Sequence, residues 1–119
     1  MLFIWVLLLL SNFVNSQIPP QLSENILKRS QNLGTKLKIF CVIQQGTKPF
    51  YFEWSKKDKP IAPSDPHYQI DSRDEESELM ISKLKLNDSG NYSCVVRNDF
   101  GFDSQLTQIF VKGLKLQFF

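Results

Sequence analysis

Residues 87–94 constrain the fold of this 119-residue chain more than any other stretch. Asp88 and Gly90 are residue types that favour a turn, and the sequence after them changes to a regular alternation. The residues that recur at every second position are Tyr92, Cys94 and Val96. Because neighbouring side chains of a strand point to opposite faces, this period predicts a turn followed by a strand with one face in the core.

The positions of the cysteines and of a tryptophan between them extend this pattern. Cys41 is the only other cysteine, and Trp54 lies between the two cysteines in a run of aromatic residues. The order Cys41, Trp54 and Tyr92-x-Cys94 resembles the signature of the immunoglobulin superfamily. The resemblance extends over residues 19–112, and its carriers are Cys41, Trp54, Leu79, Met80, Ile81, Leu84, Asp88, Gly90, Tyr92, Cys94, Arg97, Asn98 and Gly101.

A finer resemblance comes from the two ends of this region. Residues 94–101 and the opening pair Pro19 and Pro20 look most like the intermediate-set (I-set) modules of multi-domain adhesion receptors. Among these, the chain is similar to the Down syndrome cell adhesion molecule (Dscam) family of arthropods. The resemblance implies an all-β fold, an immunoglobulin-like β-sandwich of two antiparallel sheets with Greek-key topology and one inter-sheet disulfide. The core signature that it implies consists of Trp54, Leu79, Ile81, Asp88, Gly90 and Tyr92.

The first sixteen residues have the composition of a secretory signal peptide. They contain no charged side chain, and residues 2–10 form a continuous apolar run. That run is too short to cross roughly 30 Å of hydrocarbon as a helix, and residues 14–16 before Gln17 suit a cleavage site. The alternative, a buried core strand, fills no position that an immunoglobulin domain needs. We therefore predict a signal peptide at residues 1–16 and a secreted chain.

Residues 17–112 are predicted to form one immunoglobulin-like (I-set) domain, followed by a tail or linker outside the fold at residues 113–119. In a chain addressed to the oxidising secretory pathway, two cysteines allow a single pairing, Cys41 with Cys94. Closing a loop of about 54 residues stabilises the fold by about 4 kcal/mol in the chain-entropy model. Because the tail contains large apolar residues with no sheet position to fill, we expect the natural polypeptide to continue after Phe119.

Alternation elsewhere predicts the inward faces of the other strands. The residues expected to point inward are Leu37, Ile39, Cys41 and Ile43, then Phe52 and Trp54, then Leu79 and Ile81, and finally Thr107, Ile109 and Val111. We expect Trp54 to pack on the disulfide and the Tyr92 hydroxyl to bond upstream backbone in a tyrosine corner. Residues 71–78 are interpreted as an acidic connection, in which Arg73 is a candidate ion-pair partner of Asp88.

Groups suited to catalysis are sparse. The single histidine, His67, lies in a proline-rich segment and is interpreted as a surface residue, and the sequence has no glycine-rich phosphate loop. The adjacent acids at 74–76 lack the spaced oxygen ligands that calcium requires. The lysines at 56–59 are interpreted as a solvated loop rather than a basic ligand site. We therefore expect no enzyme, no cofactor, no metal and no small-molecule substrate.

The charge of the chain gives no indication of a polyanionic partner. The net charge is +2, and the basic residues are interpreted as scattered along the chain. Nucleic acid and an anionic membrane surface are therefore not expected as partners, and a membrane is expected only through a parent receptor.

The alternation also predicts which surface meets a partner. If Tyr92, Cys94 and Val96 point inward, then the residues between them face outward on the same sheet. The candidate partner-binding residues on that outer face are Tyr51, Val95, Leu106 and Phe110. Contiguous exposed apolar side chains mark interaction sites, so we expect this face to carry the contact. The alternative is a register shifted by one residue, which would bury the same side chains.

Two Asn-x-Ser sequons predict N-glycosylation in a secreted chain. They begin at Asn87 and Asn91. Asn87 lies at the predicted turn and is the better acceptor on grounds of accessibility. A glycan on Asn91 would stand on the outer face and restrict the contact to the far end of that sheet.

The functional prediction is an extracellular module that recognises another protein, of the Dscam cell-adhesion type. Like-with-like binding in a parent receptor is what the resemblance implies. Two alternatives stay open: a secreted single-domain immune-type binder, and a spacer domain whose surface binds nothing. Further modules before or after this domain would favour adhesion or spacing, and a true stop after Phe119 would favour the soluble binder.

Overall fold

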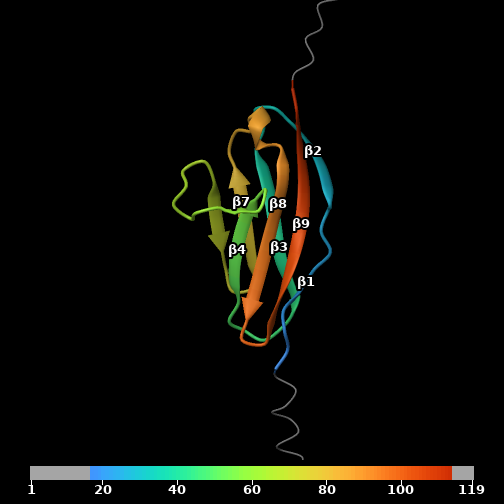
Figure 1. Cartoon of the computed structure of the whole chain (residues 1–119), viewed down its shortest axis with the longest axis vertical. Coiled ribbons are helices and arrows are strands. Elements are labelled where there is room, and N and C mark those ends of the chain that lie inside the picture. Colours follow the sequence, from blue (N-terminus) through green and yellow to red (C-terminus); the bar gives the residue numbers. More distant parts are fainter. Residues whose placement is uncertain (1–16, 114–119) are drawn as a thin grey trace, which may run out of the picture.

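Two β-sheets packed face to face make up residues 17–113, the part of the chain that the computed structural model describes (Figure 1). One sheet has the order β1-β3-β7-β6 and the other the order β2-β9-β8-β4-β5. The strands are β1 (Gln21–Leu22), β2 (Lys28–Asn32), β3 (Leu37–Gln45), β4 (Tyr51–Lys56), β5 (Lys59–Pro60), β6 (Gln69–Ser72), β7 (Glu76–Ile81), β8 (Gly90–Asn98) and β9 (Gly101–Lys112), with a short 3₁₀ helix η1 (Leu86–Asp88). The all-β sandwich that we predicted is confirmed.

All strand pairs are antiparallel except β2 with β9, which is parallel. The described part begins at one end of the sandwich and ends at the other (Figure 1). The predicted signal peptide at 1–16 lies outside the described residues, as does the predicted tail apart from Gly113. Across residues 17–113, no helix has the length and apolar character needed to cross a bilayer.

The core is filled from both sheets by residues that alternate with exposed ones. Leu37, Ile39 and Cys41 are buried in β3, and Ile43 at the end of that strand is half-buried. In β9 the buried positions are Gln105, Thr107, Ile109 and Val111. Each fully buried Leu or Ile side chain stabilises the fold by roughly 1.5–3 kcal/mol relative to an exposed one. Burial at every second residue of these strands therefore matches the period of two that is visible in the sequence.

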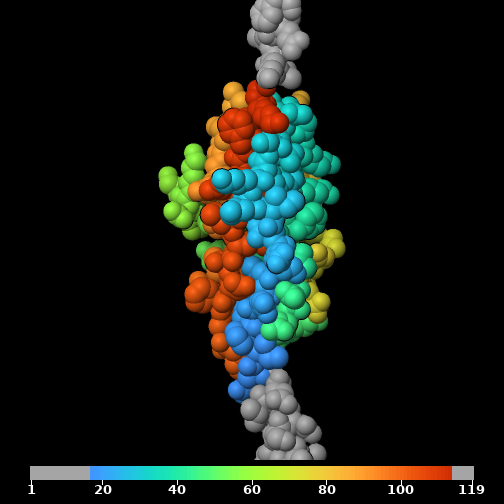
Figure 2. Space-filling view, turned by 90° about the vertical axis from the view of Figure 1, so that its right-hand side faces the viewer, coloured from blue at the N-terminus to red at the C-terminus, as the bar shows by residue number. Residues whose placement is uncertain are grey.

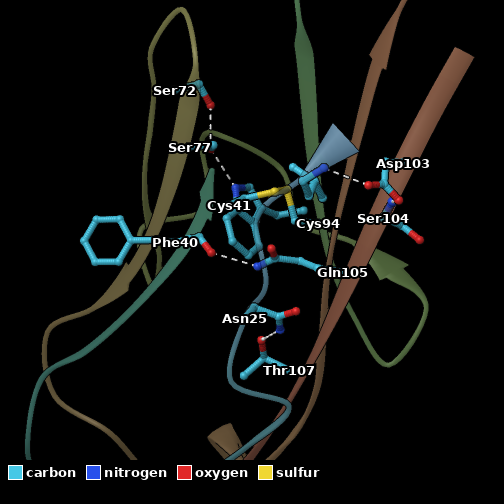
Figure 3. Close-up of a disulfide and its surroundings, with 12 residues drawn as sticks. Asn25, Phe40, Cys41, Ser72, Ser77, Cys94, Asp103, Ser104, Gln105 and Thr107 are labelled. Carbon is cyan, nitrogen blue, oxygen red and sulfur yellow. Dashed lines mark hydrogen bonds between the residues drawn. A yellow bond between two sulfur atoms is a disulfide. The ribbon is translucent and has the colours of Figure 1, made fainter. Parts of the chain in front are cut away.

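The disulfide joins the two sheets at the centre of this core. Cys41 of β3 and Cys94 of β8 are bonded, with their Cα atoms 6.4 Å apart and neither residue exposed. Trp54 lies opposite Cys94 in the β4–β8 ladder and is 2% exposed. Its indole Nε1 donates a hydrogen bond to Ser77 Oγ at 2.8 Å, and Ser77 Oγ in turn contacts Ser72 Oγ at 2.7 Å (Figure 3). Because a buried N–H needs a partner, the small Ser77 in β7 is the residue that allows the indole to be buried.

A tyrosine corner lies at the beginning of β8, next to Gly90. The Tyr92 hydroxyl donates to the Asp88 carbonyl oxygen at 2.6 Å, and the Tyr92 side chain is 1% exposed. Between them, Gly90 has φ of +151°, a conformation that residues with a Cβ rarely adopt. A Cβ at that position would also meet the Lys57 side chain at 3.0 Å.

The buried carboxylate of Asp88 is satisfied by two donors. Its Oδ2 accepts the Lys85 backbone N–H at 2.8 Å, and its Oδ1 is bonded to His67 Nε2. Asp88 is 2% exposed, so both bonds are made away from solvent. His67, which we interpreted as a surface residue, keeps 34% of its side chain exposed, and its ring also ties the segment before β6 to the corner.

The predicted pairing of Arg73 with Asp88 is wrong. Arg73 lies just after β6 and contacts Asp71 at 3.2 Å and Glu76 at 3.5 Å. The reason is the direction of β6: the residues before this strand lie at the Asp88 corner, and the strand carries Arg73 away from it. Sequence distance alone could not decide which of the two basic residues reaches Asp88.

Two segments that we interpreted as irregular connections are ordered by strand pairing. Lys57 and Asp58 have positive φ values of 50° and 64°, as in a two-residue hairpin turn, and they connect β4 to β5. The acidic segment 71–78 belongs largely to β6 and β7, where Asp71 pairs with Glu78.

The chain crosses from one sheet to the other between β1 and β2. Side chains donate hydrogen bonds to backbone carbonyl oxygens along the edge of the sandwich that this segment crosses. Gln105 Nε2 of β9 donates to the Phe40 carbonyl oxygen at 2.8 Å (Figure 3). Arg29 Nη1 donates to the Lys38 carbonyl oxygen at 2.7 Å. Asn25 Nδ2 donates to the Leu106 carbonyl oxygen at 3.0 Å. Acceptors on the β3 edge are thus occupied, which blocks strand addition there.

A mutation pair tests which basic residue supports Asp88. We expect His67→Ala to lower the free energy of unfolding by about 1–3 kcal/mol, because it leaves a buried carboxylate oxygen without its donor. Arg73→Ala removes only exposed ion pairs and should cost less than about 1 kcal/mol. Urea denaturation of both variants measures the difference. A larger loss for Arg73→Ala would contradict the assignment of His67.

The tyrosine corner should also give the fold an alkaline limit. Burial, with neighbouring Tyr68 and Asp88, raises the pKa of the Tyr92 hydroxyl far above its usual range. The unfolded chain ionises this group near pH 10 while the folded protein keeps it neutral, so stability is complete below about pH 10 and falls above it.

Tyr92→Phe removes that contribution. Between about pH 9 and about pH 11 its free energy of unfolding should fall less steeply than that of the wild type, by up to about 1.4 kcal/mol per pH unit. At neutral pH the same variant should be about 1 kcal/mol less stable, because the hydrogen bond is lost. The exposed Tyr51→Phe is the matched control, and equal slopes in both variants would refute the assignment.

Candidate protein-binding face

The outer face of the five-stranded sheet carries large exposed apolar side chains. Tyr51 of β4 is 62% exposed, and Phe102 and Phe110 of β9 are 66% and 63% exposed. Leu106 is 37% exposed, and Val95 is half-buried among its neighbours. The strand register therefore presents the predicted partner-binding residues to solvent, and the alternative of a register shifted by one residue does not hold.

Three of these strands contribute one row of side chains near the end of the face. Tyr51 of β4, Arg97 of β8 and Phe102 of β9 are direct neighbours in the two ladders. The Arg97 guanidinium carbon lies 5.5 Å from the centroid of the Phe102 ring, within the range of a cation–π contact. The row places an arginine between two exposed aromatic rings, and we refer to it as the aromatic row.

Phe102 was missed by the sequence analysis. The outer-face residues that the alternation predicts on the last strand are Leu106 and Phe110. The signal was present, because Phe102 has the same parity as Leu106 and Phe110, and the turn consists only of Asp99 and Phe100. The register of β8 with β9 is what brings Phe102 beside Arg97.

The remaining predicted residues do not join this row as one contiguous patch. The next rows are polar or mixed, with Glu53, Val95 and Ser104 in one and Ser55, Ser93 and Leu106 in the next. Phe110 lies eight residues beyond Phe102 along β9, which corresponds to about 27 Å. It packs instead beside Ser30 of β2. The exposed aromatic side chains therefore lie at two separate ends of the face. The aromatic row contains two of them, and the other end contains Phe110.

Two charged side chains of opposite sign lie at the aromatic row and beside it. Arg97 occupies the row, and Glu53 is exposed in the next one. Within residues 17–113 neither side chain takes part in an ion pair. Both charges are thus available to a partner.

The two sequons lie on different parts of the surface. Asn87 is exposed in η1, at the corner before β8. Asn91 is exposed on the outer face of β8, opposite Gln108. Asn91 lies six residues from Arg97, about 20 Å along the strand, so a glycan there would cover the other end of the face and leave the aromatic row accessible.

Potential metal ligands are dispersed over the described part of the chain. Within residues 17–113, no three histidine, cysteine, aspartate or glutamate side chains converge as ligands. Glu75 is paired with Lys48 at 3.0 Å and Glu76 with Arg73. Two of the three acids at 74–76 are therefore engaged in surface ion pairs.

Comparison with known proteins identifies what the chain is similar to. The family model for the immunoglobulin I-set domain matches residues 20–111. The cell adhesion molecule DSCAM of Gallus gallus is 33% identical over 99 residues, which cover 83% of this chain and 5% of that protein. The fibroblast growth factor receptor of Strongylocentrotus purpuratus is 31% identical over 85 residues, covering 71% of this chain and 8% of the receptor. The chain thus spans only a small part of the curated relatives it matches.

Solved structures give the same fold. The crystal structure of the Dscam1 Ig7 domain, isoform 5, superimposes with a TM-score of 0.73 at 20% identity, covering 81% of this chain and 99% of that one. The titin domains I67–I69, in an E-to-A mutated variant, superimpose with a TM-score of 0.74 at 26% identity, covering 82% of this chain and 34% of that one.

The positions of the sequons give a prediction for the chain when it is expressed through the secretory pathway. We expect at least one N-glycan, with Asn87 occupied more fully than Asn91 because it projects from a corner rather than from the flat of a sheet. Mass spectrometry of the deglycosylated peptides measures occupancy at each site. Asn87→Gln and Asn91→Gln are the matched variants, and a secreted preparation with neither site occupied would refute the prediction.

Proposed function

The chain belongs to the immunoglobulin I-set family, and on that premise we propose that it is an extracellular protein-recognition module of the Dscam cell-adhesion type. The family gives the fold, and several relatives are named as cell adhesion molecules. Fold alone does not define a function, so the proposal depends on the surface. The observation that carries it is the aromatic row of Tyr51, Arg97 and Phe102.

The composition of the aromatic row is that of a protein contact. Tyrosine and arginine are enriched among the residues that dominate binding energy at interfaces, and such residues cluster on a few adjacent positions. Tyr51 and Phe102 are 62% and 66% exposed, so their burial by a partner would remove large apolar areas from water. Arg97 between them has no carboxylate partner of its own within residues 17–113 and can pair with one across an interface.

The charge pattern of this face favours a second copy of the chain as the partner. In a two-fold contact the same surface meets itself, so it must carry both members of each charged pair. Arg97 and Glu53 are such a pair, on neighbouring strands and one row apart along the face. This face therefore carries both charges that a contact between two identical copies would need.

The proposal predicts that charges placed in the aromatic row disrupt association. Tyr51→Asp with Phe102→Asp should abolish self-association without unfolding, because each substitution would bury a carboxylate at the centre of the contact. Tyr51→Asp with Phe110→Asp tests the wider face that the sequence indicates. Phe40→Asp is the matched control, because Phe40 is an exposed phenylalanine on the other sheet.

Sedimentation of the secreted chain at increasing concentration measures the association, with thermal unfolding as the check on folding. Self-association that is lost in the aromatic-row variant and retained in Phe40→Asp supports the proposal. A wild type that stays monomeric at high concentration would overturn like-with-like recognition and make the spacer the better account. Loss of association in all variants alike would show that the aromatic row is not the contact.

A further inference from the structure

Six lysines gather at the end of the sandwich opposite the aromatic row. They are Lys36, Lys56, Lys57, Lys83, Lys85 and Lys112, and we call this group the basic pole. The end of β9, the turn before β3 and η1 lie together at this end in the upper part of Figure 1. The lysines therefore come from separate elements and meet only in the folded chain.

Backbone hydrogen bonds fix the elements of the basic pole against one another. The turn before β3 is bonded to the segment after β7 through Gly34 N to Leu84 O at 2.8 Å and Leu84 N to Thr35 O at 2.9 Å. These bonds bring Lys36 beside Lys83 and Lys85, which flank Leu84 in the sequence. The Leu33 N–H donates to the Lys112 carbonyl oxygen at 2.9 Å, which adds the end of β9.

The hairpin between β4 and β5 completes the group. The Lys57 N–H donates to the Asn91 carbonyl oxygen at 2.9 Å, and Lys56 Nζ donates to the Asn87 carbonyl oxygen. Lys56 and Lys85 line one shallow depression of about 190 Å³ beside η1.

Acidic side chains do not neutralise the basic pole. Within residues 17–113, none of the six lysines takes part in an ion pair. Asp88, the acid within η1, is 2% exposed and is already bonded to Lys85 N and His67. The other acid in these segments is Asp58, in the hairpin turn.

Acids are instead concentrated toward the other end. Asp71, Asp74, Glu75 and Glu76 lie around the turn between β6 and β7. The net charge of +2 thus conceals an uneven distribution. Our interpretation of the basic residues as scattered does not hold for these six lysines, although it holds for the other basic residues of the described part. Sequence spacing could not reveal this, because the lysines are brought together by strand pairing.

The residue types at the basic pole favour a polyanion over a protein. Lysine is depleted in protein interfaces, whereas aromatic residues and arginine anchor them. The large apolar side chain exposed in these segments is Leu86, and no aromatic one accompanies it. A protein partner with the acidic charge of a second copy is also disfavoured, because Glu75 and Glu76 are already paired with Lys48 and Arg73.

We propose that the basic pole binds a sulfated polysaccharide. The lysines come from several separate turns and strand ends, which suits a flexible chain of repeated anions better than the plane of a bilayer. The basic surface continues along the edge formed by β2 and β9, which lie side by side in Figure 2. Lys28 is exposed on that edge, about 13 Å from Asn32, which pairs with Lys112. The choice of polysaccharide rests on the extracellular location proposed above.

Heparin is the probe for the test, and the protein is the secreted chain. The wild type should bind heparin with an affinity that falls steeply with salt, because binding a polyanion releases its counterions. Lys36→Gln with Lys83→Gln should weaken binding about tenfold and lower the slope of log affinity against log salt by up to about two. Both side chains are exposed, so the folded state should be unaffected.

Lys38→Gln with Lys48→Gln is the matched control. It removes the same charge, but Lys38 and Lys48 lie outside the basic pole and pair with Glu78 and Glu75. Equal loss in the two double variants would overturn the proposal, since binding would then depend on net charge alone. Absence of heparin binding would overturn it outright.

Further probes separate the sources of negative charge. Unsulfated hyaluronan, phosphatidylserine vesicles and a DNA duplex should all bind more weakly than heparin at equal salt, and equal binding to any of them would refute the assignment to sulfated polysaccharide. Heparin binding needs no protein partner. A failure to bind heparin would therefore leave the proposal for the aromatic row untouched. A chain that binds heparin but stays monomeric would contradict only like-with-like recognition through the aromatic row.

Discussion

The disulfide between Cys41 and Cys94, with Trp54 packed against it, is the constraint to which the rest of the sandwich is fitted. It joins β3 of one sheet to β8 of the other, and both sulfur-bearing residues are fully buried. The indole beside it carries a polar N–H into the core, and Ser77 of the facing sheet accepts it. Covalent bond, ring packing and hydrogen bond therefore all hold the same two sheets at one separation and in one register.

That fixed register decides what the outer surface can present. Because Cys94 must point inward, Val95 and Arg97 must point outward, and the ladders with β4 and β9 then place Tyr51 and Phe102 on either side of Arg97. A shift of one residue in the register of β8 would turn the core side chains to the surface and would move the Cys94 sulfur away from the Cys41 sulfur. The aromatic row is thus a consequence of the same alternation that builds the core.

The two surfaces described above differ in chemistry and lie at opposite ends of the sandwich. One is aromatic, with a single arginine, and the other is lysine-rich, with the buried carboxylate of Asp88 beside it. Strand direction produces this separation, because β8 runs from the corner at Gly90 to the turn after Asn98. Residues close to one of these turns therefore lie at the same end of the sandwich as that turn. A module arranged in this way can engage a partner and a polyanion without competition between them.

The sequence by itself determined the class of fold, the pairing of the cysteines, the inward residues of β3 and β9 and the tyrosine corner. Each of these follows from a period of two or from one local motif, which is encoded within a few neighbouring residues. The exposure of Tyr51, Leu106 and Phe110 followed from the same period. Only the tertiary structure decided that His67 and not Arg73 reaches Asp88, that Phe102 completes the row with Arg97, and that lysines from separate turns share one pole. These features depend on which strand ends meet and on the register between strands, and no local pattern of residues contains that information.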